Sequence, residues 1–97
     1  CISPGSRNSP LTYAFTINAG ITCYSHVDER SSSFFALGLS KSKKGPVVII
    51  STSGTAAANF FPAVIEASHS RVPIIILSAD RPGNLIGSGE NQTINQE

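Results

Sequence analysis

Val47-Val48-Ile49-Ile50 is an unbroken apolar run, and the turn-forming segment Ser51-Thr52-Ser53-Gly54-Thr55 follows it directly. Runs of this kind are typical of strands buried on both faces, as in a parallel sheet covered by helices. A second run of the same kind occupies residues 74–77. The alanine-rich segment between them, residues 56–67, predicts a helix. The central part of the chain therefore predicts a strand, a helix and a second strand.

The same alternation extends toward the N-terminus. Residues 1–3 have the character of the end of a strand, and residues 21–27 predict another strand. A helical apolar pattern begins at Pro10, and a second one covers residues 30–44. Alternating strands and helices predict an α/β fold, a doubly wound parallel sheet with helices on both faces and right-handed crossovers.

Several details of the helices follow from residue types. Phe34 and Phe35 are expected to lie in the core, and Gly38 to mark close packing of its helix against the sheet. Pro62 is expected either to kink the helix of residues 56–67 or to mark its true start. His26 is expected to be a core or interface residue, and Cys23 to be buried and inert.

The composition limits the size and setting of the protein. The chain has 97 residues, which is one domain at most, and 40% of them are hydrophobic, so it can form a core. Charged residues make up 13%, whereas about 25% is usual, and this indicates a surface that other protein covers. The net charge of +1 gives no sign of binding to nucleic acid or acidic membrane. Two cysteines are too few for a disulfide framework and favour a reduced, cytoplasmic setting.

No part of the sequence has the spacing of a metal site or the length of a membrane span. The two cysteines and two histidines lack ligand spacing, and no apolar run approaches the ~20 residues that a span requires. The chain begins with Cys1 rather than Met, and a new helix is expected to begin at Glu97. We therefore expect residues 1–97 to be a partial N-terminal domain of a longer protein.

The loops that follow the predicted strands hold most of the charged residues and glycines that could bind a ligand. In a parallel sheet these loops emerge at one edge, the carboxyl edge, where open α/β sheets bind ligands. They are residues 4–7, 28–30, 53–55 and 80–82.

Glu29 lies where a predicted strand passes into a predicted helix. The helix dipole favours the ionised carboxylate, whereas burial would oppose ionisation. A glutamate in that position suits the exchange of a hydrogen bond or a proton with a ligand. The alternative is that Asp28 and Glu29 only cap the helix start.

The other loops offer groups for anions and for a flat ring. Arg7 and Arg81 are planar donors suited to carboxylate or phosphate, and the alternative is that each forms a surface salt bridge. Ser6 lies near a helix start, which suits an anion. The segment around Gly54 lacks the lysine and spacing of a P-loop, so we expect its glycine to let a flat ring approach the backbone.

These loops together resemble the pyrimidine-binding domain of thiamine diphosphate enzymes, and most closely the synthases of menaquinone biosynthesis. The motifs that carry the resemblance are PGSRNSPL (4–11), DERS (28–31), FALGL (35–39), TSGTA (52–56), PAVIEA (62–67), ADRP (79–82) and the pair Asn91-Gln92 with Ile94 and Gln96. They cover nearly the whole chain, and their order makes the resemblance specific.

The resemblance implies a role for each matching residue. Glu29 would be the catalytic residue that hydrogen-bonds the aminopyrimidine of thiamine diphosphate and promotes loss of the thiazolium proton. Pro4, Gly54 and Thr55 would line the pyrimidine end of the cofactor. The residues that would bind substrate are Ser6, Arg7, Arg81, Asn91 and Gln92.

The resemblance also implies a reaction and its partners. The enzyme would decarboxylate 2-oxoglutarate and add the resulting succinyl carbanion to isochorismate. Its active sites would lie between two subunits of a homodimer or homotetramer, so this chain alone is expected to be inactive. Mg²⁺ is implied, with ligands in a domain that this chain lacks.

Some residues depart from the pattern, and two alternatives remain open. Asn8 stands where many relatives have serine, Gly83 where a second proline is common, and residues 87–90 are unusually rich in glycine. The chain could belong to another thiamine diphosphate enzyme, of the acetolactate synthase or 2-oxoacid decarboxylase type. It could also be a non-catalytic binding or dimerisation module of the same fold.

Overall fold

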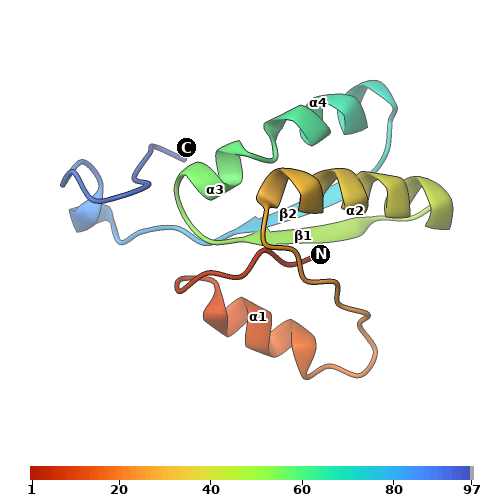
Figure 1. Cartoon of the computed structure of the whole chain (residues 1–97), viewed down its shortest axis with the longest axis horizontal. Coiled ribbons are helices and arrows are strands. Elements are labelled where there is room, and N and C mark those ends of the chain that lie inside the picture. The colour runs from red at the N-terminus through yellow and green to blue at the C-terminus, as the bar shows by residue number, and fades with distance from the viewer. Residues whose placement is uncertain (97) are drawn as a thin grey trace.

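A parallel pair of strands forms the centre of the computed structural model, which describes residues 1–96 (Figure 1). Strand β1 (Val47–Ser51) pairs with β2 (Ile74–Ser78), and Ile50 lies opposite Leu77. Two isolated parallel bridges widen the sheet, one joining Ile2 to Ile50 and one joining Ile2 to Ser25. The parallel sheet predicted from the sequence is therefore confirmed.

The two N-terminal segments contribute less strand than the sequence predicts. Ile2 donates its amide hydrogen to the oxygen of Tyr24 at 2.8 Å, and its own oxygen accepts from the amide of His26 at 2.9 Å. Beyond this ladder the segment has no regular pairing among the described residues, so the strand predicted over residues 21–27 is wrong in its length. The reason is that its neighbour, residues 1–3, offers only Ile2 as a pairing residue.

Helices cover both faces of the sheet, as predicted. Three of them lie on one side, and α1 (Ser9–Thr16) lies on the other (Figure 1). The three are α2 (Glu29–Lys43), α3 (Thr55–Ala58) and α4 (Phe61–His69). Pro62 lies in the first turn of α4, where its missing amide hydrogen costs no helical bond. Of the two roles considered for this proline, the start of a helix is the correct one.

The core forms where α2, α3 and α4 meet β1. Phe60, Ile49 and Ala36 are at most 1% exposed. The buried face of α2 consists mainly of small side chains. They are Ser32, Ser33, Ala36 and Ser40, and Leu37 is the one large residue among them. Small residues on that face allow the helix to lie close to its neighbours.

The predicted places of three α2 residues are wrong. Phe34 and Phe35 are 43% and 42% exposed, because the small residues occupy the buried face and turn the phenylalanines away. The ring of Phe35 packs against Tyr24 and His26 instead, with centroids 5.1 and 4.8 Å away. Gly38 is exposed, and an added Cβ would meet nothing within 4 Å, so it marks no close packing.

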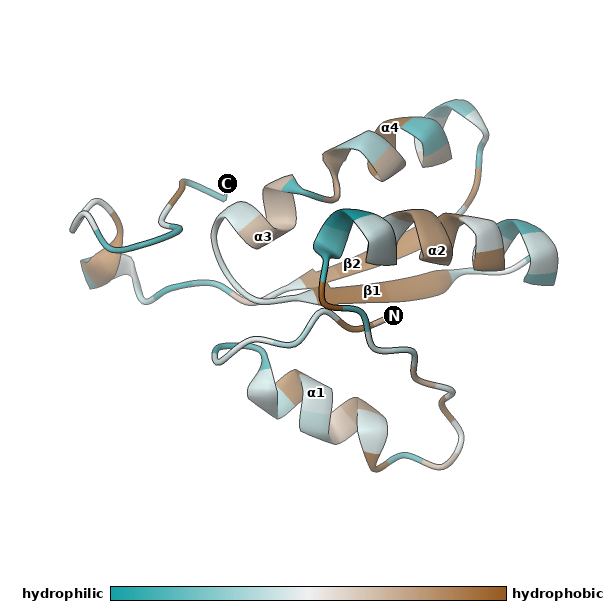
Figure 2. Ribbon diagram, viewed as in Figure 1, coloured by the Kyte–Doolittle hydropathy of each residue, from teal (hydrophilic) through white to brown (hydrophobic). Residues whose placement is uncertain are grey.

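Apolar side chains also lie on the surface. Figure 2 shows hydrophobic colour along both strands, and Ile75 and Ile76 of β2 are 48% and 43% exposed. Val27, next to the start of α2, is 98% exposed. Within residues 1–96, no helix is long and apolar enough to cross a membrane. A short 3₁₀ helix, η1 (Gly83–Leu85), interrupts the C-terminal tail, and the helix expected to begin at Glu97 lies outside the described residues.

Candidate functional site

One row of paired residues sets the positions of four predicted site residues. Ser25, Ile2, Ile50 and Leu77 lie side by side across the sheet through the two bridges and the β1–β2 register. The residues four positions beyond this row are Glu29, Ser6, Gly54 and Arg81. All four segments run in parallel, so these residues leave the sheet at its carboxyl edge, where the sequence predicted the site.

Asn8 closes the first of the four loops. Its side chain is fully buried; Oδ1 accepts a hydrogen bond from the amide of Gly5 at 2.7 Å, and Nδ2 donates to the oxygen of Ser3 at 2.9 Å. A Cβ on Gly5 would lie 2.6 Å from the Cβ of Thr52, so the first loop packs directly on the loop after β1. Asn8 thus fixes the backbone that carries Ser6 and Arg7.

Asp28 and Glu29 play different parts at the start of α2. Asp28 is the N-cap residue, and its Oδ1 accepts a hydrogen bond from the amide of Ser31 at 2.7 Å. That backbone hydrogen bond is the main cause that lowers the pKa of Asp28 from the usual value for aspartate. Glu29 is the first helical residue and is partly buried, and within residues 1–96 its carboxylate has no hydrogen-bond or ion-pair partner. The capping interpretation therefore holds for Asp28 and leaves Glu29 available to a ligand.

The loop after β1 is covered by the chain's own tail. Gly54 has a φ of +78°, and a Cβ there would lie 1.7 Å from the oxygen of Gln92. Its amide donates to Oε1 of Gln96 at 2.7 Å, and the amide of Thr55 donates to the oxygen of Gln92 at 3.2 Å. Gln96 also donates through Nε2 to the oxygen of Ala79 at 3.1 Å. The tail therefore links the loops that follow β1 and β2, and it is this tail that approaches the Gly54 backbone.

Arg7 and Arg81 converge on one carboxylate, that of Glu90. Arg81 donates from Nη1 to Oε2 of Glu90 and from Nη2 to the oxygen of Asn91. Nη2 of Arg7 lies 3.9 Å from the same Oε2. The Arg81 side chain is 7% exposed, and that of Arg7 33%. The salt-bridge alternative is thus realised, and it brings the two arginines together.

The remaining predicted residues lie on open surface. Pro4, Ser6 and Thr55 are exposed at the carboxyl edge, as are Asn91 and Gln92 in the tail. Gln92 has a φ of +60°, a left-handed conformation that helps to aim its oxygen at Thr55. Within residues 1–96, no group of three or more His, Cys, Asp or Glu side chains could hold a metal ion.

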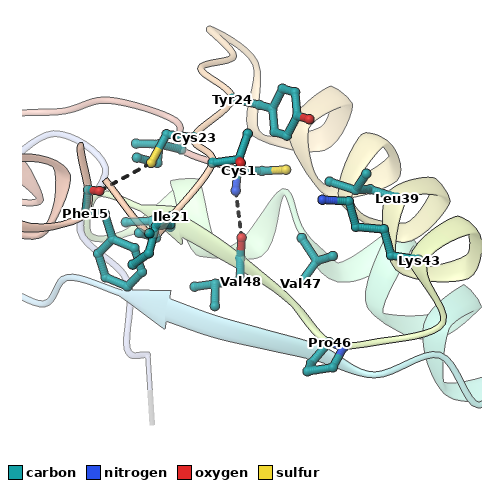
Figure 3. Close-up of a pocket in the computed structure, with 14 residues that line it drawn as sticks. Cys1, Phe15, Ile21, Cys23, Tyr24, Leu39, Lys43, Pro46, Val47 and Val48 are labelled. Carbon is teal, nitrogen blue, oxygen red and sulfur yellow. Dashed lines mark hydrogen bonds between the residues drawn. The ribbon is translucent and has the colours of Figure 1, made fainter. Parts of the chain in front are cut away.

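A cavity lies at the opposite end of the sheet. It has a volume of about 350 Å³, and its lining includes Cys1, Tyr24, Lys43 and Val47 (Figure 3). Cys23, which is only partly buried, also lines it and donates from Sγ to the oxygen of Phe15 at 3.6 Å. None of the predicted site residues lines this cavity. The candidate site is therefore an edge of the sheet, with a carboxylate that has no partner within residues 1–96 on one loop and two guanidinium groups on others.

Sequence reasoning overlooked three residues that shape this edge. Asn8 and Gln96 each bridge two backbone groups, and Glu90 pairs with both arginines. Glu90 had a visible signal, because it is the one charged residue in residues 82–96. An isolated carboxylate in a polar, glycine-rich tail is a candidate ion-pair partner for arginine side chains in other loops.

The sequence matches known proteins along its whole length. Residues 1–97 match the family described as thiamine pyrophosphate enzyme, N-terminal TPP binding domain. The chain is 58% identical over 97 residues to a 2-succinyl-5-enolpyruvyl-6-hydroxy-3-cyclohexene-1-carboxylate synthase of Chlorobium phaeobacteroides, and 54% identical over 97 residues to one of Halobacterium salinarum. All of this chain is covered in both, but only 17% of each relative.

The fold matches a solved structure as well. Benzoylformate decarboxylase from Polynucleobacter necessarius superimposes with a TM-score of 0.76 and 22% sequence identity. The match covers 95% of this chain and 17% of that one. At this identity the likeness concerns the fold alone, and it agrees with the α/β architecture described above.

Proposed function

Because the chain belongs to the family of the N-terminal TPP binding domain of thiamine pyrophosphate enzymes, we propose that the protein containing it decarboxylates 2-oxoglutarate and adds the succinyl unit to isochorismate in menaquinone biosynthesis. The relatives that share more than half of its residues carry the name of that synthase, which supports the proposal. The enzyme is then a transferase that forms a carbon–carbon bond, with thiamine diphosphate as cofactor.

The observation that carries the proposal is the state of Glu29. A carboxyl group that is partly buried at a helix start, without a partner in residues 1–96, can accept a hydrogen bond from a heterocycle when ionised and donate one when protonated. Thiamine diphosphate supplies, when bound, a stabilised carbanion equivalent for the decarboxylation. Glu29 would hold the aminopyrimidine in the tautomer that accepts a proton.

Pro4, Gly54 and Thr55 would lie along the pyrimidine. Gly54 would do so only through its backbone, because its φ is positive and the oxygen of Gln92 lies where a side chain would begin. Arg7 and Arg81 would bind the substrate carboxylates as charge-assisted donors, with Ser6, Asn91 and Gln92 supplying neutral polar contacts. These assignments give every loop of the carboxyl edge a part in binding.

The rest of the enzyme would complete the site. The diphosphate and Mg²⁺ would bind to a domain outside this chain, and a second subunit of a homodimer or homotetramer would close the open edge. The exposed apolar side chains around α2 and β2 support burial against further protein. Two free cysteines agree with a cytoplasmic setting.

The test is exchange of the thiazolium proton of thiamine diphosphate in the full-length protein. Glu29→Gln should slow this exchange by about 10²-fold or more, the usual size of such acid–base effects. Glu66→Gln, a surface substitution in α4, should leave exchange unchanged. Equal exchange rates in the wild type and Glu29→Gln would sink the role of Glu29.

A second thiamine diphosphate activity of the acetolactate synthase or 2-oxoacid decarboxylase type is the alternative. Product analysis with 2-oxoglutarate, alone and with isochorismate, separates the two. Arg81 and the Asn91-Gln92 tail favour the synthase, because they offer binding groups for a substrate that carries several carboxylates. A protein that fails to bind thiamine diphosphate in calorimetry would instead be a non-catalytic module of the fold.

A further inference from the structure

Glu90 is paired with the guanidinium groups of Arg7 and Arg81, which the proposed substrate carboxylates would need. The nearest guanidinium nitrogens of Arg7 and Arg81 both face its Oε2 atom. Glu90 is also 47% exposed at its side chain, whereas that of Arg81 is 7% exposed. A buried cation is thus neutralised by a carboxylate that reaches in from the surface.

The arginines keep capacity for another anion. Two positive charges face one negative charge, so the cluster of Arg7, Arg81 and Glu90 carries a net charge of +1. Nε of Arg81 is buried and has no hydrogen-bond partner in the described part of the chain. A buried guanidinium with an unpaired N–H favours any ligand that supplies a further acceptor.

The Glu90 side chain can leave the two arginines without disturbing the core. Residues 86–90 are all exposed, and Gly87 and Gly89 adopt φ values of +81° and +76°. A Cβ at either glycine would meet nothing within 4 Å. Glu90 itself lines a hollow of about 370 Å³ with its neighbours in the tail. Its departure therefore breaks surface contacts and little packing.

We propose that Glu90 is an internal competitor: its carboxylate pairs with Arg7 and Arg81, and a substrate carboxylate must displace it to bind them. The inference rests on the proposed function for the identity of the substrate, but the competition itself needs only the two arginines. Glu90 is then a residue that sets affinity and selects against weakly charged ligands, without touching the reacting atoms.

Calorimetry with succinate on the full-length protein tests the competition. Succinate is a dicarboxylate that cannot be decarboxylated, so binding is measured without turnover. Removing the competitor in Glu90→Gln and Glu90→Ala should tighten succinate binding by about three- to tenfold, in the range expected for loss of a partly exposed ion pair. Arg81→Gln should weaken succinate binding in the wild-type background and in the Glu90→Gln background.

Glu66→Gln is the matched control for the change in net charge. Glu66 also forms a single exposed ion pair, with Lys41 at 3.8 Å in another part of the fold. Its substitution should leave succinate affinity unchanged within twofold. Unchanged or weaker binding in both Glu90 variants, or no succinate binding in any variant, overturns the competition.

A result different from the one that overturns the competition would contradict the proposed function. Absence of thiamine diphosphate binding to the same full-length protein would contradict the enzyme assignment but not the competition, which is read from succinate alone. Normal cofactor binding and turnover with no effect of Glu90 on succinate affinity would contradict only the competition.

Discussion

The amide of Gly54 donates a hydrogen bond of 2.7 Å to the side-chain oxygen of Gln96, which lies 42 residues further along the chain. The same side chain donates to the oxygen of Ala79. One amide side chain therefore pairs a donor on the loop after β1 with an acceptor on the segment after β2. Both backbone groups would otherwise need water or a ligand.

Gln96→Leu should destabilise the full-length protein by about 1–3 kcal/mol, because it leaves both backbone groups without their partner. Gln96→Glu keeps the acceptor for Gly54 and loses the donor to Ala79, so it should also destabilise the protein. Denaturant unfolding measures both. Asn84→Ala, at an exposed amide in η1, is the control and should change stability by less than about 0.5 kcal/mol. Equal stability of Gln96→Leu and the wild type would contradict the bridging role.

Gly54→Ala should destabilise the protein by more than about 1 kcal/mol, since the site has a positive φ and the new Cβ would collide with Gln92. The tail must then move, and affinity for thiamine diphosphate should fall with it. Gly38→Ala is the matched control, because the α2 surface has space for a methyl group. That substitution should stabilise the protein by about 0.5–1 kcal/mol. Opposite signs for the two glycines, measured by urea unfolding, are the expected result.

Asn8→Ala should cost about 1–3 kcal/mol, because Gly5 and Ser3 both lose a buried partner. Asn8→Asp keeps the acceptor for Gly5 but removes the donor to Ser3, so it should also destabilise the protein. Loss of the loop geometry should weaken succinate binding through Arg7 in both variants. Unfolding and calorimetry on the same samples separate a loss of stability from a loss of binding. An Asn8→Ala variant with wild-type values in both would show that the loop closes without this side chain.

The N-cap at Asp28 predicts a pH dependence. Hydrogen bonding from Ser31 lowers the pKa of Asp28 in the folded state, so the ionised cap stabilises the protein above the unfolded pKa, about 3.9 for aspartate. This contribution is lost as the pH falls through the lowered folded pKa. Asp28→Asn retains an acceptor without the charge and should reduce the change in unfolding free energy between pH 5 and about pH 3. An identical pH profile in Asp28→Asn would contradict the assignment.

The central fold could be predicted because its strands and helix boundaries carry local signals. The apolar runs at β1 and β2 are bounded by turn residues, and Pro62 marks the start of α4. The four loops also emerge at one edge of the sheet, as predicted, because parallel strands force their following loops to one side. These features depend on periodicity and residue type alone.

The buried face of α2 could not be predicted in the same way. It contains serines, which hydrophobic periodicity assigns to the surface, yet Ser33 and Ser40 are buried. Their hydroxyl groups donate to backbone oxygens: Ser33 to Arg30 at 2.8 Å, and Ser40 to Gly45 at 2.7 Å and Pro73 at 2.9 Å. Hydrogen bonds to backbone oxygens thus make these two serines compatible with the core, and the phenylalanines lie on the exposed side of the helix.

The contacts of the tail were also beyond sequence reasoning. Glu90 and Gln96 act through partners in distant loops, and no local pattern encodes which loop a polar tail will meet. The sequence placed both arginines at the correct edge but gave no sign that one carboxylate joins them. The two hydrogen bonds of the Asn8 side chain to backbone groups likewise have no signal in the local sequence.

The row formed by Ser25, Ile2, Ile50 and Leu77 has a consequence for insertions and deletions. Each connecting segment has the same length from that row to a candidate site residue. One extra residue in any segment would therefore displace that segment's site residue relative to the other three, while the sheet stayed intact. Proteins of this lineage should therefore tolerate new side chains in these connections far more readily than a change in their length.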